Sequence, residues 1–113
     1  MRYFLNRVFA RRLKVSDLSE EFATKVLDDI FAGRSISLGQ GLYKIRASAE
    51  KRGKRGGYRV VFVWKKEGYL IFCELFGKNA KENLEYREIK ALYILAQKYA
   101  EFTNYDVAVV SRY

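Results

Sequence analysis

The sequence predicts an α+β domain: a small antiparallel β-sheet (a meander) with helices packed on one face, in the order β-α-α-β-β-β-α. Half of the 113 residues are hydrophobic, which suffices for one core in a single domain spanning residues 1–113. Two stretches in the first third carry apolar residues at helical spacing. Three later stretches are rich in β-branched and aromatic residues, which favour strands.

The first third of the chain is predicted to contain a short strand and two helices. Residues 2–5 (RYFL) favour the strand. The first helix follows, with apolar residues on one side: Val8, Phe9 and Leu13. The second helix starts from an N-cap at Ser16 or Asp17 and stops at Gly33. Its apolar stripe has four-residue spacing: Leu18, Phe22, Val26 and Ile30.

The middle of the chain is predicted to form the meander. Residues 34–41 are expected to be a connection. Three strands follow, at residues 42–48, 58–64 and 69–77. The segment KKEG between the last two is typical of a tight hairpin.

A third helix is predicted from Leu84 to Phe102, where apolar residues recur three and four positions apart, as in a helix laid on a sheet. Residues 103–113 are left as a tail of uncertain structure. With the helices on one face, the other face of the sheet is expected to be open and basic.

The positive charge of the chain is concentrated in one segment. The net charge is +9, from 22 Lys and Arg against 13 Asp and Glu. Nine of these cations and a single acid, Glu50, fall between Lys44 and Lys66. Such a segment predicts a polyanionic partner: nucleic acid, an acidic protein or an anionic membrane surface.

The composition also excludes several kinds of chemistry. The chain has no histidine and one cysteine, Cys73, so a zinc site and an internal disulfide are excluded, and no metal or cofactor is expected. Cys73 is interpreted as a buried strand residue in a protein of the reducing cytoplasm. No apolar run approaches the ~20 residues that a membrane span needs.

Alternation along the strands places cations together. Lys44 and Arg46 project to one face of their strand, and Arg59 lies on the next strand between Tyr58 and Val60. If the two strands pair, the three cations converge on one open surface. The glycine-rich segment between the strands is expected to form a loop whose cations lie over that surface: Lys51, Arg52, Lys54 and Arg55.

A solvated hairpin is the alternative interpretation of this charge. It is disfavoured because Arg59 interrupts a strand of core-type residues, where a cation is costly without a partner. Two further residues are placed near the same surface. Lys78 ends the third meander strand, and Tyr86 stands near the start of the last helix, where its phenol is a candidate to enter the cleft.

Three stretches, LGQGLYKIR, GKRGGYRVVF and FGKNAKENLEYREIKAL, together resemble the RelE/HigB-like toxins of bacterial type II toxin–antitoxin systems. The resemblance covers about residues 20–100. It implies a RelE-like α+β domain that enters the ribosomal A site and cleaves messenger RNA, with a cognate antitoxin protein that holds it inactive. Operator DNA is an expected partner only through the toxin–antitoxin complex, and no membrane is involved.

The resemblance also implies roles for individual residues. Lys44 and Arg46 match the basic strand, Arg59 the arginine on the scissile phosphate, Lys78 the basic strand end, and Lys54 the loop lysine. Further cations are expected to contact RNA: Lys51, Arg52, Arg55, Lys65, Lys66 and Lys81. Some members carry an arginine where this chain has Asn79, and Tyr86 is offset by about one residue from the catalytic tyrosine of those members. Other members use histidine, which is absent here.

A mechanism follows from RNA carrying its own nucleophile, the 2′-OH. Arg59, helped by Arg46, is predicted to neutralise the phosphorane oxygens, because a guanidinium binds two oxygens and keeps its charge. Like charges disfavour a protonated lysine, so Lys44 or Lys54 is the candidate base. The candidate acid is Lys78 or the other lysine. The expected product is a 2′,3′-cyclic phosphate.

Two other classes of function remain open from the sequence. A non-catalytic basic binder, such as an RNA-binding module or a ParE-like gyrase inhibitor, shares the fold without needing the converging cations. The amphipathic, basic N-terminal helix also suits a membrane surface, although packing on a core is favoured.

Overall fold

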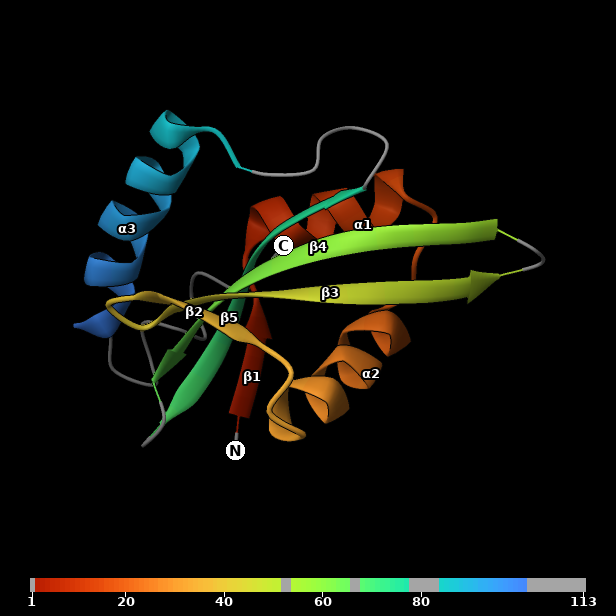
Figure 1. Cartoon of the computed structure of the whole chain (residues 1–113), viewed down its shortest axis with the longest axis horizontal. Coiled ribbons are helices and arrows are strands. Elements are labelled where there is room, and N and C mark those ends of the chain that lie inside the picture. The colour runs from red at the N-terminus through yellow and green to blue at the C-terminus, as the bar shows by residue number, and fades with distance from the viewer. Residues whose placement is uncertain (1, 52–53, 66–67, 78–83, 102–113) are drawn as a thin grey trace.

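The computed structural model describes residues 2–51, 54–65, 68–77 and 84–101, with side chains for all of these except residues 49–56. It contains a five-stranded sheet and three helices (Figure 1), which confirms the predicted α+β class. The strands are β1 (Arg2–Leu5), β2 (Ile36–Gly39), β3 (Leu42–Lys51), β4 (Lys54–Lys65) and β5 (Tyr69–Gly77). The helices are α1 (Arg7–Val15), α2 (Glu20–Phe31) and α3 (Tyr86–Ala100).

The sheet has the order β1-β5-β4-β3-β2 and is mixed, not purely antiparallel. β3, β4 and β5 form the predicted antiparallel meander. β1 joins the far edge in parallel, with Arg2 beside Tyr69 and Leu5 beside Phe72. A four-residue strand carries too little pattern to specify its partner, so the sequence did not indicate this parallel pairing.

The predicted connection at residues 34–41 is wrong, because β2 lies within it and pairs antiparallel with β3. The chain reverses between these strands at Gln40. Gly39, Gln40 and Gly41 have φ values of 92°, 56° and 80°, and this left-handed run closes a tight hairpin. The glycines that suggested a loop are therefore the turn of an additional hairpin.

The helices cover both faces of the sheet, which corrects the prediction that all of them pack on one face. α1 and α2 share a core with Val60 and Phe62 of β4, whereas α3 packs on the other face against Val61 and Val63. The cause is visible in β4, whose consecutive apolar residues point alternately to both faces. A strand that is apolar on both faces needs cover on both.

The helix boundaries follow local capping. The Asn6 side chain accepts a hydrogen bond from the Phe9 amide and caps α1. Ser16 ends α1 and Asp17 turns the chain with φ 56°, so neither is the N-cap predicted for α2, which begins after Ser19. Glu85 and Glu88 form a capping box at the start of α3, two residues later than predicted. The predicted tail at residues 103–113 lies outside the described residues.

Polar contacts attach the C-terminal half of α3 to the sheet. The Tyr69 hydroxyl donates to the Tyr99 carbonyl, and the Asn6 amide donates to the Tyr99 hydroxyl at 3.3 Å. The Tyr93 hydroxyl donates to the Leu38 carbonyl of β2. Lys65 Nζ, an expected RNA contact, donates to the Ala100 carbonyl at 3.2 Å. The helix is thereby tied to the sheet at residues 93–100.

The buried Cys73 thiol and Tyr99 phenol, in the core between the sheet and α3, predict that the protein loses stability at alkaline pH. Burial raises the pKa of the Cys73 thiol and of the Tyr99 phenol above their ordinary values. The unfolded chain releases these protons above about pH 8.5 and 10, respectively, while the folded protein retains them. Below about pH 8.5 neither group changes the free energy of unfolding. The thiol lowers it as pH rises above about 8.5, and the phenol adds to the decrease above about pH 10, each by up to about 1.4 kcal/mol per pH unit.

Urea unfolding at a series of pH values from 8 to 11 measures this effect. Cys73→Ala should lower stability at pH 8 yet flatten the decline between about pH 8.5 and 10, because the titrating thiol is gone. An identical decline in Cys73→Ala and the parent protein would show that the thiol does not contribute.

Candidate functional site

Cations from two strands lie side by side on the face of the sheet that α3 partly covers. Arg46 of β3 and Arg59 of β4 are register partners, so their Cα atoms are about 5 Å apart. Lys44 lies two residues from Arg46 and opposite Val61, one row further along the same face. Lys44 and Arg59 are half-buried and Arg46 is exposed. The three side chains are thus grouped on one surface.

An irregularity in β5 adds an aromatic ring to this row. Phe62 pairs with Phe72, but Val61 pairs with Glu74, so Cys73 is an extra residue in β5. The shift places Phe76 opposite Arg59. In a regular ladder Leu75 would take that place, and Phe76 would face α1 and α2.

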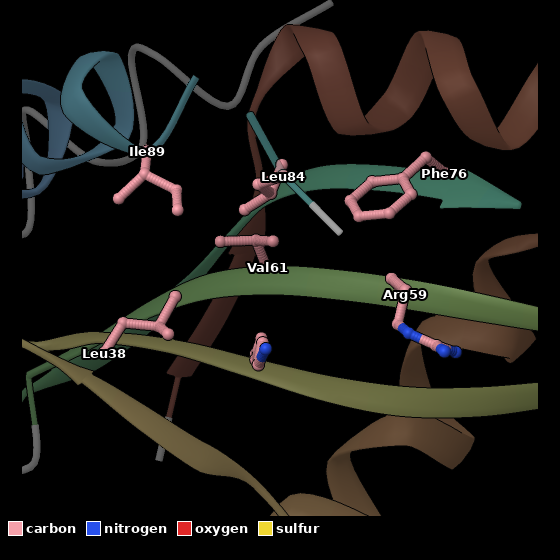
Figure 2. A pocket seen from close by; sticks show the side chains of 7 residues that line it. Leu38, Arg59, Val61, Phe76, Leu84 and Ile89 are labelled. Atoms are coloured by element: carbon pink, nitrogen blue, oxygen red, sulfur yellow. The ribbon is translucent and has the colours of Figure 1, made fainter. Parts of the chain in front are cut away.

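These residues border a cavity of about 250 Å³ between the sheet and the start of α3. Figure 2 shows Leu38, Val61, Leu84 and Ile89 around its apolar part, with Arg59 and Phe76 on neighbouring strands at one side. Lys44 is the remaining lining residue in the described part of the chain. The cavity therefore joins an apolar interior to two cations.

The electrostatics of this surface favour an anion. Among the side chains that the structure describes, no acid forms an ion pair with Lys44, Arg46 or Arg59. Like charges directly opposite each other on neighbouring strands destabilise a sheet by up to about 1 kcal/mol. A phosphate between Arg46 and Arg59 would relieve this repulsion and accept hydrogen bonds from both guanidinium groups.

Two of the sequence-predicted site residues lie away from this cavity. Tyr86 is the first residue of α3 and is 77% exposed, with Lys90 Nζ 5.6 Å from the centre of its ring. It stands in the chain between Leu84 and Ile89, which both line the cavity. Lys65 lies six residues along β4 from Arg59, about 20 Å away, at the end of α3.

The predicted glycine-rich loop is mostly strand. β3 runs to Lys51 and β4 begins at Lys54, and these two residues are register partners. Gly56 and Gly57 are strand residues of a two-stranded ribbon that projects beyond the rest of the sheet (Figure 1). The backbone of Lys54 is five residues from Arg59, about 17 Å along the ribbon. The ribbon therefore extends outward from the cationic surface and does not fold back over it.

The remaining predicted contacts are only partly visible. Arg55 belongs to the ribbon backbone, opposite Glu50. Four other predicted residues lie outside the described residues: Arg52, Lys66, Lys78 and Lys81. Asn79 lies there as well.

Sequence reasoning missed most of the cavity wall. Leu38 lies in the segment that the sequence predicts as a connection, and Phe76 reaches this face only through the extra residue in β5. Ile89 belongs to the predicted apolar side of the last helix, but the prediction places that helix on the other face. The signal that could have located the wall is the apolar run of β4, which requires a helix on each face.

The described residues were also compared with the requirements of a metal site and of a membrane-spanning helix. No cluster of three or more Cys, Asp or Glu side chains suited to a metal ion occurs among them. Within the same parts of the chain, no helix has the length and apolar character needed to cross a membrane.

Comparison with protein-family models identifies the family of the chain. A family model described as the RelE toxin of the RelE/RelB toxin–antitoxin system matches residues 1–112. The chain belongs to the RelE toxin family. It is therefore the toxin of a toxin–antitoxin pair, with a RelB-type antitoxin as its cognate partner. Comparison with curated proteins returns no match. The resemblance inferred from the three sequence stretches is confirmed.

Proposed function

We propose that this RelE-family toxin is a metal-independent endoribonuclease that cleaves messenger RNA on the ribosome and so inhibits translation in the cytoplasm. The observation that carries the proposal is the grouping of Lys44, Arg46 and Arg59 on one face, beside a cavity with apolar walls. Cations bind a phosphate, and an apolar wall with an aromatic ring can stack on the flat face of a base. A single nucleotide carries both a phosphate and a base.

The chemistry needs charge stabilisation more than a protein nucleophile. The 2′-oxygen of the RNA bonds to phosphorus as the bond from phosphorus to the 5′-oxygen breaks. The 2′-OH proton passes to a base, and the leaving 5′-oxygen receives a proton from an acid. Arg59 and Arg46 hold the two non-bridging oxygens, whose negative charge grows in the transition state. The products are a 2′,3′-cyclic phosphate and a 5′-hydroxyl.

Lys44 is the best-placed candidate base, because it shares the cavity with Arg59. Lys54 is less well placed, with its backbone about 17 Å along the ribbon. Lys78 or the other of the two lysines is the candidate acid. Tyr86 is kept as a catalytic candidate because it follows Leu84 of the cavity wall by two residues, although its ring is exposed beside Lys90.

The ribbon formed by β3 and β4 is proposed to guide the RNA toward this site. The paired backbones of β3 and β4 run from the Arg46–Arg59 pair to the Lys51–Lys54 pair, with Arg55 one position before Gly56 on β4. Several cations on one projecting ribbon give the regularly charged backbone of RNA a positive region to contact (Figure 1). Contacts from Arg52, Lys66 and Lys81 belong to the same proposal, as does operator DNA bound only through the toxin–antitoxin complex.

Purified toxin in a reconstituted translation reaction tests the function. Primer extension should show cuts within the translated message, and the new 3′ ends should be cyclic phosphates. The same message without ribosomes should be cut far less. Absence of cuts, together with inhibition of gyrase supercoiling by the same preparation, would replace this proposal with that of a non-catalytic gyrase inhibitor.

A further inference from the structure

A second basic surface lies on α1, which the candidate site does not use. Arg7, Arg11 and Lys14, here called the α1 stripe, are spaced four and three residues apart and are all exposed. This spacing places them along one side of the helix. The first sixteen residues of the chain contain five cations and no acid, since every acidic residue comes at Asp17 or later.

The α1 stripe is separate from the candidate site. The buried residues of α1, Phe9 and Leu13, belong to the core on the face of the sheet opposite the cavity. Arg12, the fourth cation of the helix, is an internal contact: its Nε lies 2.9 Å from Glu74 Oε1 of β5. No described acidic side chain forms an ion pair with a residue of the α1 stripe.

The α1 stripe also borders a hollow. Among the described residues, Arg7, Ala10, Arg11 and Lys14 line a space of about 200 Å³. Three cations and one small side chain thus share one space. Such an arrangement lets an anion approach the helix and contact more than one cation at once.

We propose that the α1 stripe binds the phosphate backbone of folded, double-helical RNA. No exposed aromatic side chain lies on α1, so it offers neither the stacking platform of a single-strand binder nor the aromatic centre typical of a protein interface. Double-stranded RNA is recognised largely through phosphates and shape, which cations alone can contact.

The same packing argues against a membrane. An interfacial helix needs its apolar face free, whereas Phe9, Ala10 and Leu13 of α1 are buried in the core. Because the stripe and the candidate site occupy opposite faces, the toxin can hold a single-stranded message on one face and structured RNA, such as that of a ribosome, on the other. This inference concerns binding and does not require that the toxin cleave RNA.

The test compares two variants that remove the same charge. Arg7→Gln, Arg11→Gln and Lys14→Gln are combined in the stripe variant. The control combines Lys25→Gln, Arg34→Gln and Lys98→Gln, three exposed cations of the α2 and α3 region. Both are made with Arg59→Ala, so that the RNA probe stays intact. Binding to a blunt 16-base-pair RNA duplex is measured from 50 to 200 mM salt, with urea unfolding as the check on folding.

The stripe variant should bind the duplex at least about tenfold more weakly than the Arg59→Ala parent. The slope of log affinity against log salt concentration should be smaller in magnitude by about 2 to 3. The control should stay within about threefold of the parent. Equal losses in both variants would overturn the inference. So would a stripe variant that keeps duplex binding but loses affinity for the RelB-type antitoxin or a glutamate-rich peptide, since the partner would then be an acidic protein.

Discussion

Arg59→Ala is expected to abolish messenger RNA cleavage, with a loss of at least about a hundred-fold in kcat, while the protein stays folded. Removal of a single donor that stabilises transition-state charge costs about 10²–10³ in other hydrolases, and Arg59 offers two donors to the same phosphate. The expected loss is in kcat because the charge on the phosphate oxygens grows only in the transition state.

The same substitution should leave stability nearly unchanged. Arg59 is half-buried and forms no ion pair with a described acid, and its removal ends the repulsion from Arg46 across the strands. Cleavage in the reconstituted translation reaction and urea unfolding measure the two effects separately. Arg59→Lys keeps the charge but not the planar fork, so it should recover only part of the rate.

Lys25→Ala is the matched control, because Lys25 is an exposed cation on α2, on the other face of the sheet. It should retain full activity. Cells that remain growth-inhibited by Arg59→Ala at normal protein levels would contradict the role assigned to Arg59.

Phe76→Ala is expected to weaken substrate binding with less effect on the chemical step. Phe76 lines the cavity next to Arg59 and is the aromatic ring among the lining residues that the structure describes. Stacking of a base on an aromatic ring contributes about 1–3 kcal/mol, which corresponds to a roughly 5- to 150-fold loss in kcat/KM. The loss should appear mainly in KM, because stacking is present in both the bound substrate and the transition state.

Compared with Phe76→Ala, Phe76→Tyr should keep most of the activity, since the ring face is retained, and Phe76→Leu should keep little despite its similar apolarity.

Ile89 lines the same cavity from α3, and the larger ring of Ile89→Phe is expected to fill it. Filling should raise stability by about 0.5–2 kcal/mol and still raise KM. Unchanged KM in both Phe76→Ala and Ile89→Phe would show that no base occupies the cavity.

The sequence predicted the meander and its cations because strand alternation is a local property. Lys44, Arg46 and Arg59 share a face once β3 and β4 pair, whatever the rest of the fold does. The apolar spacing of the helices was equally local, and it located α1, α2 and α3 to within a few residues. These elements needed no knowledge of distant contacts.

Features that depend on distant contacts were missed. The position of α3 depends on which face of β4 it packs against, and the helix sequence alone has no marker for this. Phe76 faces Arg59 because β5 contains one extra residue, and a bulge of this kind changes the alternation without a clear sequence signal. The length of the β3–β4 ribbon was underestimated because Gly56 and Gly57 favour loops, yet here they continue a ladder.

Tyr86 illustrates the same limit within the candidate site. Its place in the sequence suggested a phenol near the phosphate, whereas at the first turn of α3 it is exposed beside Lys90. A residue at the start of a helix changes direction by about 100° with each position, so an offset of one residue decides which way it points.

The most direct test of the site is an NMR titration of the toxin with a short RNA that carries a 2′-deoxy residue at the cut position and is therefore not cleaved. If Arg46 and Arg59 hold one phosphate next to the cavity, beside Lys44, the Nε–H signal of Arg59 and the ring signals of Phe76 should shift together, with the same affinity. The Nε–H signal of Arg34, which is paired with Asp29, should stay in place. Shifts that spare both Arg59 and Phe76 at saturating RNA would contradict the account.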